Sequence, residues 1–407
     1  MGKRSWSLSG SVFIKPEDEH LEAQLDLVLP LQGESECIRF ELHEGLDVQS
    51  LTGDNVGGWE YRGASCNTFA PEAREIAVEL KEQPPSGMID FTLSYSGKIE
   101  PVTELQINRI SSEWVELGLY SPWFPLFTEG GSPVPVCADI DVDVAGDYQV
   151  LSNNSIRKEG EVWHLSSHSP TQDIVLLAAP IFYPITEGED QMQVSVHTLT
   201  SKDGPAAREL AETGLWLLNF YRDWFSDDSK KQVTAVVAPR VTGGGYVRGP
   251  FLVLSENALS STHQIEVKTF KWLAHEFAHL WCSGAPADSW EDWLNESLAE
   301  YSALRAVAAR YSIETSEKMI DDKRNKMKKL PAIKELDRGS PEANQVLNDK
   351  GCVLLHELAS DIGRERFTEL LRILASREQY CTEQFLGALV ELTDIETARE
   401  FDRALRL

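Results

Sequence analysis

Hydrophobic and polar residues alternate in short runs over the first 200 residues of the chain. This period of two is typical of strands that bury one face, and the clusters of Gly, Pro, Asp and Asn between the runs predict turns. The runs that predict strands are residues 7–14, 22–29, 37–42, 75–80, 87–96, 136–144, 148–152, 162–166, 174–179 and 192–198. Such a succession of strands without intervening helices predicts a large antiparallel β-domain, a sandwich or a saddle.

The spacing of the hydrophobic residues changes after the last of these strands. Residues 206–225 carry apolar side chains at helical spacing, which predicts an amphipathic helix. Two short apolar runs, 232–238 and 251–254, predict buried strands on either side of a Gly-rich segment, and helical patterns follow. We therefore expect an α+β fold class with two domains, a β-domain over residues 1–200 and a mainly helical domain over residues 201–407.

Two histidines lie on one of the predicted helices. Apolar residues recur at helical spacing through residues 270–281, and the HEFAH sequence of residues 275–279 lies within them. Residues four apart on a helix share one face, so His275 and His279 can offer two imidazoles to one metal ion. Glu276 lies beside the first histidine and can act as a general base on a molecule held there. The motif predicts a zinc site.

The residues after this motif predict a third ligand. Gly284 and Pro286 are expected to end the first helix, and Ser289 with Asp292 resembles a capping box that starts a second helix. A tight turn between antiparallel helices would return Glu296 to the two histidines. Two nitrogens and one carboxylate leave a fourth position open, as in catalytic zinc sites, so we expect one zinc ion per chain. The alternative is that the histidines pack in a helical core and Glu296 is a solvated acid.

The charge and the cysteine usage restrict the partners and the compartment. A formal net charge of −27 argues against nucleic acid or an anionic membrane surface as a partner. The chain has no run of about eighteen apolar residues and no apolar core near its first residue, so we expect neither a membrane span nor a signal peptide. Six cysteines without CxxC pairs predict free thiols in a cytoplasmic protein. None of these features predicts the oligomeric state.

At the two helical motifs the chain resembles a known family. HEFAHLW (residues 275–281) followed by WLNESLAEY (residues 293–301) is similar to the aminopeptidase N family of zinc metallopeptidases, which are gluzincins. The resemblance is strongest over residues 265–305, and the gap between the two motifs is two residues shorter than is typical of the family. It implies an N-terminal β-saddle that walls one side of a substrate cleft, followed by a thermolysin-like catalytic domain. Because the chain stops soon after Phe401, we expect a short, bacterial-type member that lacks the family's further C-terminal domains.

The resemblance also implies a substrate-binding strand at Gly244 and Gly245. In the family, a GxMEN segment at this place supplies a Glu that anchors the free amino terminus of the substrate. Here Val247 stands at that position and Arg248 follows it. The amine anchor is therefore missing, which leaves exopeptidase and endopeptidase action open, and Glu291 is one acid that could replace it. Arg248 could bind a substrate carboxylate or carbonyl, or form a surface salt bridge.

A second departure from the family concerns the donor that stabilises the tetrahedral oxyanion. The family supplies this donor from the Tyr of a Tyr-x-Lys-Gly segment. The matching segment here is residues 348–351, whose Lys and Gly are in place, but Asn348 stands at the Tyr position. An Asn amide can also donate a hydrogen bond. Tyr246 and Tyr301 are substitutes, unless they are tyrosines packed in the core.

Together these features favour a zinc metallopeptidase of aminopeptidase-like activity on peptide substrates. Glu276 would take a proton from water and pass it to the leaving amine. One alternative is a catalytically weak or inactive zinc protein that binds peptides or a partner, and another is an endopeptidase or a non-peptide hydrolase with the same zinc site. The roles of two residues near the predicted ligands also stay open. Glu300 either orients a ligand or is a solvated acid, and Cys282 either faces the metal or is a core thiol.

Overall fold

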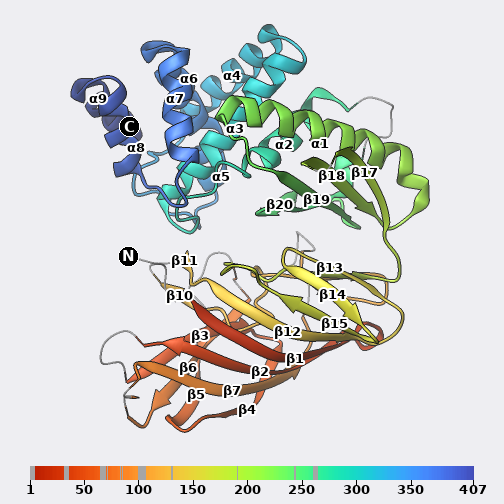
Figure 1. Cartoon of the computed structure of the whole chain (residues 1–407). Helices are drawn as coiled ribbons and strands as arrows, with labels where there is room; N and C mark the ends of the chain where they lie inside the picture. Colours follow the sequence, from red (N-terminus) through yellow and green to blue (C-terminus); the bar gives the residue numbers. More distant parts are fainter. Residues whose placement is uncertain are drawn as a thin grey trace. The chain divides into compact units, whose positions relative to one another are not determined.

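The computed structural model describes residues 5–31, 36–64, 70, 72–82, 84, 86–99, 107–129, 132–189, 191–242, 244–259 and 265–407. The chain divides into two compact units, which Figure 1 shows in the colours of the sequence. The β-unit comprises Met1–Phe182 and Pro239–Gly243, and the helical unit comprises Tyr183–Ala238 and Gly244–Leu407. A short segment of the β-unit therefore interrupts the sequence of the helical unit.

A seven-stranded sheet dominates the β-unit (Figure 1). Its strands, in spatial order, are β14 (Ser155–Glu159), β15 (Val162–Ser166), β12 (Val136–Val144), β1 (Trp6–Lys15), β2 (His20–Pro30), β7 (Met88–Gly97) and β4 (Leu46–Thr52). In β2, Leu21, Ala23, Leu25 and Leu27 are buried in the core, whereas the residues that alternate with them are exposed or half-buried. The alternation in the sequence is thus an alternation of burial. One pair, β1 with β12, is parallel, so the expected antiparallel sheet contains one exception.

Smaller sheets complete the β-unit. One consists of β3 (Cys37–His43), β6 (Ala73–Leu80) and β5 (Val56–Ala64), and another of β13 (Gln149–Ser152), β16 (Leu176–Ala179), β9 (Val115–Leu117) and β8 (Arg109–Ile110). The short strands β10 (Thr128–Glu129) and β11 (Ser132–Pro133) form a hairpin. Strands β4, β5 and β14 are absent from the predicted set, as are the short strands β8 to β11. For β5 the reason is visible, because most of its residues are exposed and their burial does not alternate.

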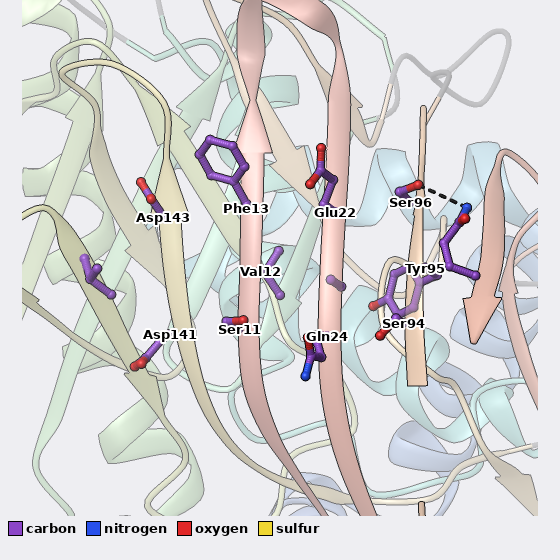
Figure 2. Close-up of a pocket in the computed structure, with 13 residues that line it drawn as sticks. Ser11, Val12, Phe13, Glu22, Gln24, Ser94, Tyr95, Ser96, Asp141 and Asp143 are labelled. Atoms are coloured by element: carbon purple, nitrogen blue, oxygen red, sulfur yellow. Dashed lines mark hydrogen bonds between the residues drawn. The ribbon is translucent and has the colours of Figure 1, made fainter. Parts of the chain in front are cut away.

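The face of the seven-stranded sheet that points away from the core carries a hollow of about 610 Å³ (Figure 2). Ser11 of β1, Gln24 of β2 and Asp141 of β12 are among the polar side chains that line it. Asp141 is paired with Nδ1 of His164 at 2.5 Å, on the neighbouring strand β15. These residues occupy the positions that alternate with the buried ones, which explains why the hollow is polar.

The helical unit begins with a five-stranded sheet. Its strands, in spatial order, are β17 (Tyr183–Glu189), β18 (Met192–Thr198), β19 (Lys231–Ala238), β21 (Phe251–Ser255) and β20 (Gly245–Arg248). The three central strands are parallel, and the two outer strands are antiparallel to their neighbours. The predicted amphipathic helix is α1 (Gly204–Phe225), which connects β18 to β19 and buries Leu210, Leu217 and Leu218.

Helices form the rest of this unit (Figure 1). They are α2 (Val267–Ala278), α3 (Trp293–Arg310), α4 (Ile313–Met327), α5 (Ala343–Gln345), a π-helical turn (Val346–Gly351), α6 (Cys352–Ile362), α7 (Arg364–Ala375), α8 (Thr382–Leu392) and α9 (Ile395–Leu405). Their buried residues share one hydrophobic core with the five-stranded sheet. The α+β class is therefore as predicted, with β-sheets first and helices after them.

The boundary between the units lies before the one that the sequence suggests. The run 192–198, which is β18, was expected in the β-domain because its residues continue the pattern of the preceding strands, and β17 was not predicted. In the structure, β18 pairs in parallel with β19 over residues 192–197 and 231–236. The hairpin β17–β18 therefore belongs to the helical unit, and the division falls between Phe182 and Tyr183. This boundary follows from the pairing of β18 with β19, a strand that comes later in the sequence. The periodicity of the residues does not reveal such a pairing.

Four of the described cysteines are free thiols, as the sequence predicts. They are Cys137, Cys282, Cys352 and Cys381. Cys66 lies outside the described residues. In the described part of the chain, no helix is long and apolar enough to cross a membrane.

Candidate metal centre

Helix α2 presents two histidines on one face, one turn apart. Nε2 of His275 lies 3.2 Å from Nε2 of His279, and the two rings meet edge to face. The sequence predicted that this helix continues to Gly284. In the structure it ends earlier, at Ala278, with His279 as its flanking residue. The turn over residues 279–282 has a visible consequence. It directs the carbonyl of Cys282 back to His279, whose Nδ1 donates a hydrogen bond to it at 3.0 Å.

Helix α3 returns the chain to these histidines. It is preceded by a 3₁₀ turn, Trp290–Asp292, at which the hydroxyl of Ser289 accepts a hydrogen bond from the backbone N–H of Glu291. Asn295 then fixes the connection between α2 and α3, because its side-chain amide exchanges two hydrogen bonds with the backbone of Ala285, both at 2.9 Å. The expected helix start near Ser289 is thus present, and the next residue after Asn295 is the predicted third ligand.

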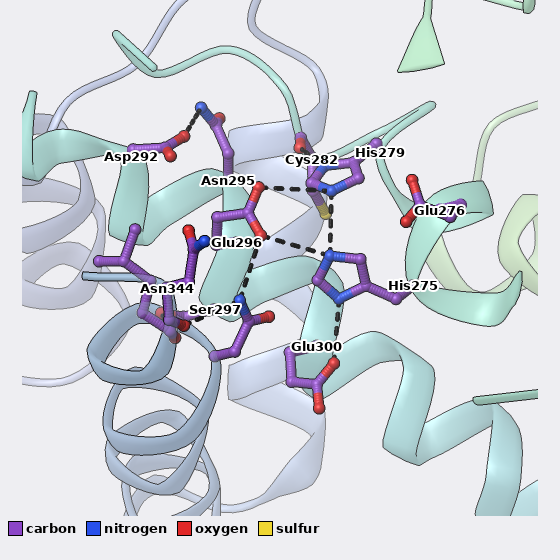
Figure 3. Close-up of polar contacts among 12 residues, drawn as sticks. His275, Glu276, His279, Cys282, Asp292, Asn295, Glu296, Ser297, Glu300 and Asn344 are labelled. Carbon is purple, nitrogen blue, oxygen red and sulfur yellow. Dashed lines mark hydrogen bonds and ion pairs between the residues drawn. The ribbon is translucent and has the colours of Figure 1, made fainter. Parts of the chain in front are cut away.

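The three predicted ligands meet at one point (Figure 3). Oε2 of Glu296 lies 3.4 Å from Nε2 of His275, and Oε1 lies 3.6 Å from Nε2 of His279. A tetrahedral zinc ion with bonds of about 2.0–2.1 Å holds neighbouring ligand atoms about 3.3 Å apart. The observed spacings of 3.2–3.6 Å therefore fit such an ion. Two imidazoles and one carboxylate also form the donor set of a catalytic zinc site.

The other nitrogen of each imidazole is already engaged. Nδ1 of His275 is hydrogen-bonded to Oε2 of Glu300 at 3.0 Å, and Nδ1 of His279 donates to a carbonyl. Figure 3 shows Glu300 on the side of the His275 ring opposite Glu296. Hydrogen bonds of this kind fix the orientation of a histidine ligand and leave its Nε2 for the metal. Glu300 is 1% exposed, so the structure supports the orienting role and not the solvated alternative.

Two lysines hold Glu300 in turn. Nζ of Lys271 lies 2.7 Å from one oxygen of Glu300, and Nζ of Lys323 lies 2.5 Å from the same oxygen. Lys323 also pairs with Asp349 at 2.8 Å and donates to the backbone carbonyl of Asn348 at 3.1 Å. Burial raises the pKa of Glu300, but Lys271, His275 and Lys323 outweigh it and hold the pKa well below its usual value. The carboxylate behind His275 is therefore charged.

The same balance of burial and charge acts on the ligands. Burial lowers the pKa of His275, but the hydrogen bonds with Glu296 and Glu300 outweigh burial and raise the pKa to about 10. Burial raises the pKa of Glu296, but the hydrogen bond from His275 and the charge of His279 lower it to about 2. Without a metal, the cluster thus favours an imidazolium–carboxylate pair. A metal ion competes with that proton for Nε2 of His275.

Glu276 lies beside the histidine pair, as the motif predicts (Figure 3). Its side chain is buried in the helical unit. Oε1 of Glu276 accepts a hydrogen bond of 2.9 Å from Nε1 of Trp272, one helical turn earlier on α2. The carboxylate therefore has one oxygen engaged within the protein.

Asn348 reaches the cluster from a π-helical turn. Its Nδ2 donates to the carbonyl of Asn344 at 3.0 Å and lies 3.4 Å from Oε2 of Glu296. A glycine is required three residues later, because a Cβ on Gly351 would lie 1.9 Å from the hydroxyl oxygen of Ser297. That hydroxyl donates to the carbonyl of Leu347 at 2.7 Å, so α3 and the turn are in close contact. Single π-turns inside helices occur often at functional sites.

The two substitute tyrosines lie elsewhere in the helical unit. Tyr301 is 3% exposed, packs edge to face on Phe367 and has Arg305 among the charges that act on it. The structure thus supports the packed alternative for Tyr301. Tyr246 is also buried, on β20, with the guanidinium of Arg248 5.2 Å from its ring centre. For Tyr301, the contact that places the ring is a packing contact.

The remaining predicted residues have specific neighbours. Gly244 and Gly245 lie next to the indole of Trp272. Arg248 donates from Nη1 to the carbonyl of Val247 at 2.9 Å. Glu291 accepts two hydrogen bonds from Thr382 at the start of α8, so it is engaged in joining helices. The thiol of Cys282 is buried, which raises its pKa to about 12 and agrees with a core thiol.

The sequence contains a signal for part of this network. On α2, Lys271, His275 and His279 follow one another at intervals of four, and on α3 so do Glu296 and Glu300. Such intervals place each set in a row on one helix face, and antiparallel helices can pair the two rows. Lys323 and Asp349 gave no such signal, because they come from other elements. The contact of Trp272 with Glu276 was also not predicted, because a Trp at helical spacing usually indicates a core residue.

Comparisons with known proteins agree with this architecture. No family model matches the chain, and no curated protein sequence matches it. Among solved structures, an M1 zinc metallopeptidase from Deinococcus radiodurans matches with a TM-score of 0.69 at 16% identity, covering 100% of this chain and 93% of that one. A mutant of the M1 zinc metallopeptidase from that organism, bound to a Tyr-Ser-Ala substrate, matches with a TM-score of 0.68 at 15% identity, covering 100% and 94%. A two-domain M1 zinc metallopeptidase mutant bound to L-tryptophan matches with a TM-score of 0.71 at 15% identity and the same coverage.

These likenesses establish the fold. The chain has the two-domain fold of the M1 zinc metallopeptidases, which are the aminopeptidase N family. The family resemblance inferred from the two helical motifs is thus confirmed for the fold. The structural likeness extends over the full length of the chain, whereas the motifs covered only about a tenth of it.

Proposed function

We propose that this protein is a zinc-dependent metallopeptidase of the aminopeptidase N family. The observation that carries the proposal is the spacing of 3.2–3.6 Å between the ligand atoms of His275, His279 and Glu296, with a buried carboxylate, Glu276, beside them. The fold neighbours are zinc peptidases, and one of them holds the peptide Tyr-Ser-Ala. One zinc ion per chain would occupy this site.

The residues of the site can then perform hydrolysis as follows. Zinc bound to His275, His279 and Glu296 would polarise the scissile carbonyl and lower the pKa of the attacking water. Glu276 takes a proton from that water and passes it to the amine that leaves. Glu300 keeps Nδ1 of His275 occupied, so that Nε2 stays directed at the ligand position. Asn348 would have to release its amide from Glu296 or Asn344 to donate where charge develops on the carbonyl oxygen.

Strand β20 is suited to bind the substrate backbone. Among the described strands, β20 pairs with β21 on one side, and it is the last strand of its sheet. An extended peptide can add to such an edge through main-chain hydrogen bonds. No acid stands at the position that the resemblance assigns to the amine anchor, because Val247 occupies it. We therefore propose peptide hydrolysis without strict selection for a free amino terminus.

A second candidate is a weak or inactive zinc protein that binds peptides. One observation favours it: the amide of Asn348 is directed to Glu296 and Asn344, so it is partly engaged inside the protein. An intact Glu276 opposes it, because a protein that only binds peptides does not need a general base. The two candidates differ in whether any peptide bond is cleaved.

The deciding experiment uses the purified full chain loaded with one equivalent of zinc. It is incubated with Tyr-Ser-Ala and with a mixed peptide library, and both ends of every fragment are identified by mass spectrometry. We expect cleavage that chelation abolishes and zinc restores. Loss of single N-terminal residues indicates an aminopeptidase, and internal cuts indicate an endopeptidase. A zinc-loaded chain that cleaves no peptide would contradict the proposal and favour the second candidate, an inactive zinc protein that binds peptides.

A further inference from the structure

Trp272 contacts the general base directly. Its indole nitrogen lies 2.9 Å from Oε1 of Glu276, and the two residues are four apart on α2. Side chains on a helix lean toward its N-terminus, so the Glu276 side chain extends back over the preceding turn, where the indole lies. An indole nitrogen can only donate, so the direction of this hydrogen bond does not depend on a tautomer. The contact leaves Oε2 of Glu276 for a second partner.

Gly245 makes room for this indole. A Cβ built on Gly245 would lie 3.3 Å from Cζ2 of Trp272 and 3.0 Å from Cδ2 of Leu254. A Cβ on Gly244, whose φ is +55°, would lie 4.0 Å from the indole nitrogen. Gly245 is the first residue of the edge strand β20. The indole therefore lies between the base and the start of the strand to which a peptide would add.

We propose that Trp272 is a positioning residue for Glu276, a role that rests on the proposed function. A glutamate side chain has three rotatable bonds, and a single directed hydrogen bond to Oε1 removes most of that freedom. The other oxygen, Oε2, then faces the attacking water and receives its proton. Holding a reacting group in this way lowers the entropy lost on reaching the transition state. Gly245 contributes by leaving space for the indole.

The chemistry of the contact agrees with this role. The indole N–H is a neutral donor, so it fixes the direction of the Glu276 carboxylate without forming an ion pair with it.

The first test compares Trp272→Phe with the wild type on a peptide that the wild type cleaves. The phenyl ring keeps most of the packing but cannot donate. We expect kcat to fall about ten-fold, with KM and zinc content within about two-fold, because the donor acts on the base and not on substrate or metal. Gly245→Ala, which displaces the indole without removing it, should change kcat in the same direction by less. Trp216→Phe on α1 is the matched control, since its ring stacks on Phe220 in the same unit.

A double-mutant comparison separates positioning from general damage. In a Glu276→Ala background there is no carboxylate to hold, so adding Trp272→Phe should leave the residual rate unchanged. A second ten-fold loss there, or a wild-type kcat in Trp272→Phe alone, would overturn the inference. A wild type that cleaves no peptide would instead overturn the proposed function.

The hydrogen bond can also be observed without turnover. Selective ¹⁵N labelling of the Trp indoles gives one N–H signal per tryptophan, and the signal that Trp272→Phe removes is that of Trp272. In the metal-free protein, Glu276→Ala should shift this signal and speed its exchange with solvent at least several-fold, while the other indole signals stay in place. An unchanged signal would show that the indole does not donate to Glu276 and would overturn the inference.

Discussion

Each unit of the molecule buries charged side chains, but the two sets have different neighbours. In the β-unit, Glu116 is fully buried, accepts a hydrogen bond from the indole of Trp114 at 3.1 Å, and faces Arg240 at 3.5 Å. In the helical unit, the buried Glu300 binds two lysines and also the imidazole of His275. The first set connects structural residues, and the second connects to a predicted metal ligand.

This comparison shows how to interpret a buried charge. Taking a charged side chain out of water costs several kcal/mol, so both sets must be paired to exist at all. Pairing alone therefore does not indicate function. In the β-unit, Arg240 also donates to the carbonyl of Thr242, and the pair fixes the segment Pro239–Gly243. In the helical unit, the pairing ends on Nδ1 of a histidine whose Nε2 faces two other ligand atoms. That continuation distinguishes the site.

The largest effect should come from the base. Glu276→Gln keeps the size of the side chain and its ability to accept from Trp272, but an amide cannot take a proton from water. We expect turnover to fall by about 10²–10⁴-fold. Steady-state rates on a cleaved peptide, with zinc content measured by elemental analysis, provide the check. Glu116→Gln is the matched control in the β-unit and should retain its rate once folded. Equal rates for Glu276→Gln and wild type would remove Glu276 from the mechanism.

Removal of the metal should destabilise the helical unit and leave the β-unit unchanged. A ligand that binds only the folded form adds about 4 kcal/mol at a free concentration of about 1,000 times its Kd. Chelation should therefore lower the unfolding temperature of the helical unit. Calorimetry with and without chelator measures the shift, and hydrogen exchange assigns it to residues of one unit. A uniform loss of protection over both units would contradict the assignment of zinc to the helical unit.

The next effect contrasts the two buried glutamates directly. Glu300→Gln removes the charge behind His275 and should weaken zinc binding by about 10–100-fold, as is typical when the partner of a histidine ligand is changed. Glu116→Gln should lower the stability of the β-unit by up to about 3–5 kcal/mol, because it breaks the buried ion pair with Arg240, at unchanged zinc affinity. Competition with a fluorescent chelator gives the affinities, and denaturant unfolding gives the stabilities. If both variants lost zinc equally, the comparison would fail.

The smallest effect concerns the oxyanion donor. The side-chain amide of Asn348 lies 3.4 Å from Glu296 and donates to the carbonyl of Asn344. It is therefore a weaker donor to the oxyanion than a phenol at the same position. We expect Asn348→Tyr to raise kcat by about ten-fold on a cleaved peptide, part of the roughly 10²–10³-fold that one such donor contributes elsewhere. Zinc content and KM should be unchanged. A neutral Asn348→Tyr together with an inactive Tyr246→Phe would show that Tyr246 supplies the donor.

The sequence by itself predicted the three residues that meet at the candidate metal centre and the helices that carry them. Local spacing was sufficient, because His275 and His279 are one turn apart and Glu296 follows after one short connection. The alternating strands of the β-unit were also visible in the sequence, since burial on one face imposes a period of two. Strands without that alternation, such as β5, were missed for the same reason.

Only the tertiary structure decided the roles of residues whose partners are distant in sequence. Glu300 could orient a ligand or be solvated, and its contacts with Lys271 and Lys323 decided the question. Tyr301 could be a donor or a packed ring, and its edge-to-face contact with Phe367 supports the packed ring. Periodicity reports which face of an element is buried and not which element covers it. The contacts between helices, set by packing of the whole unit, therefore assigned the partners of these side chains.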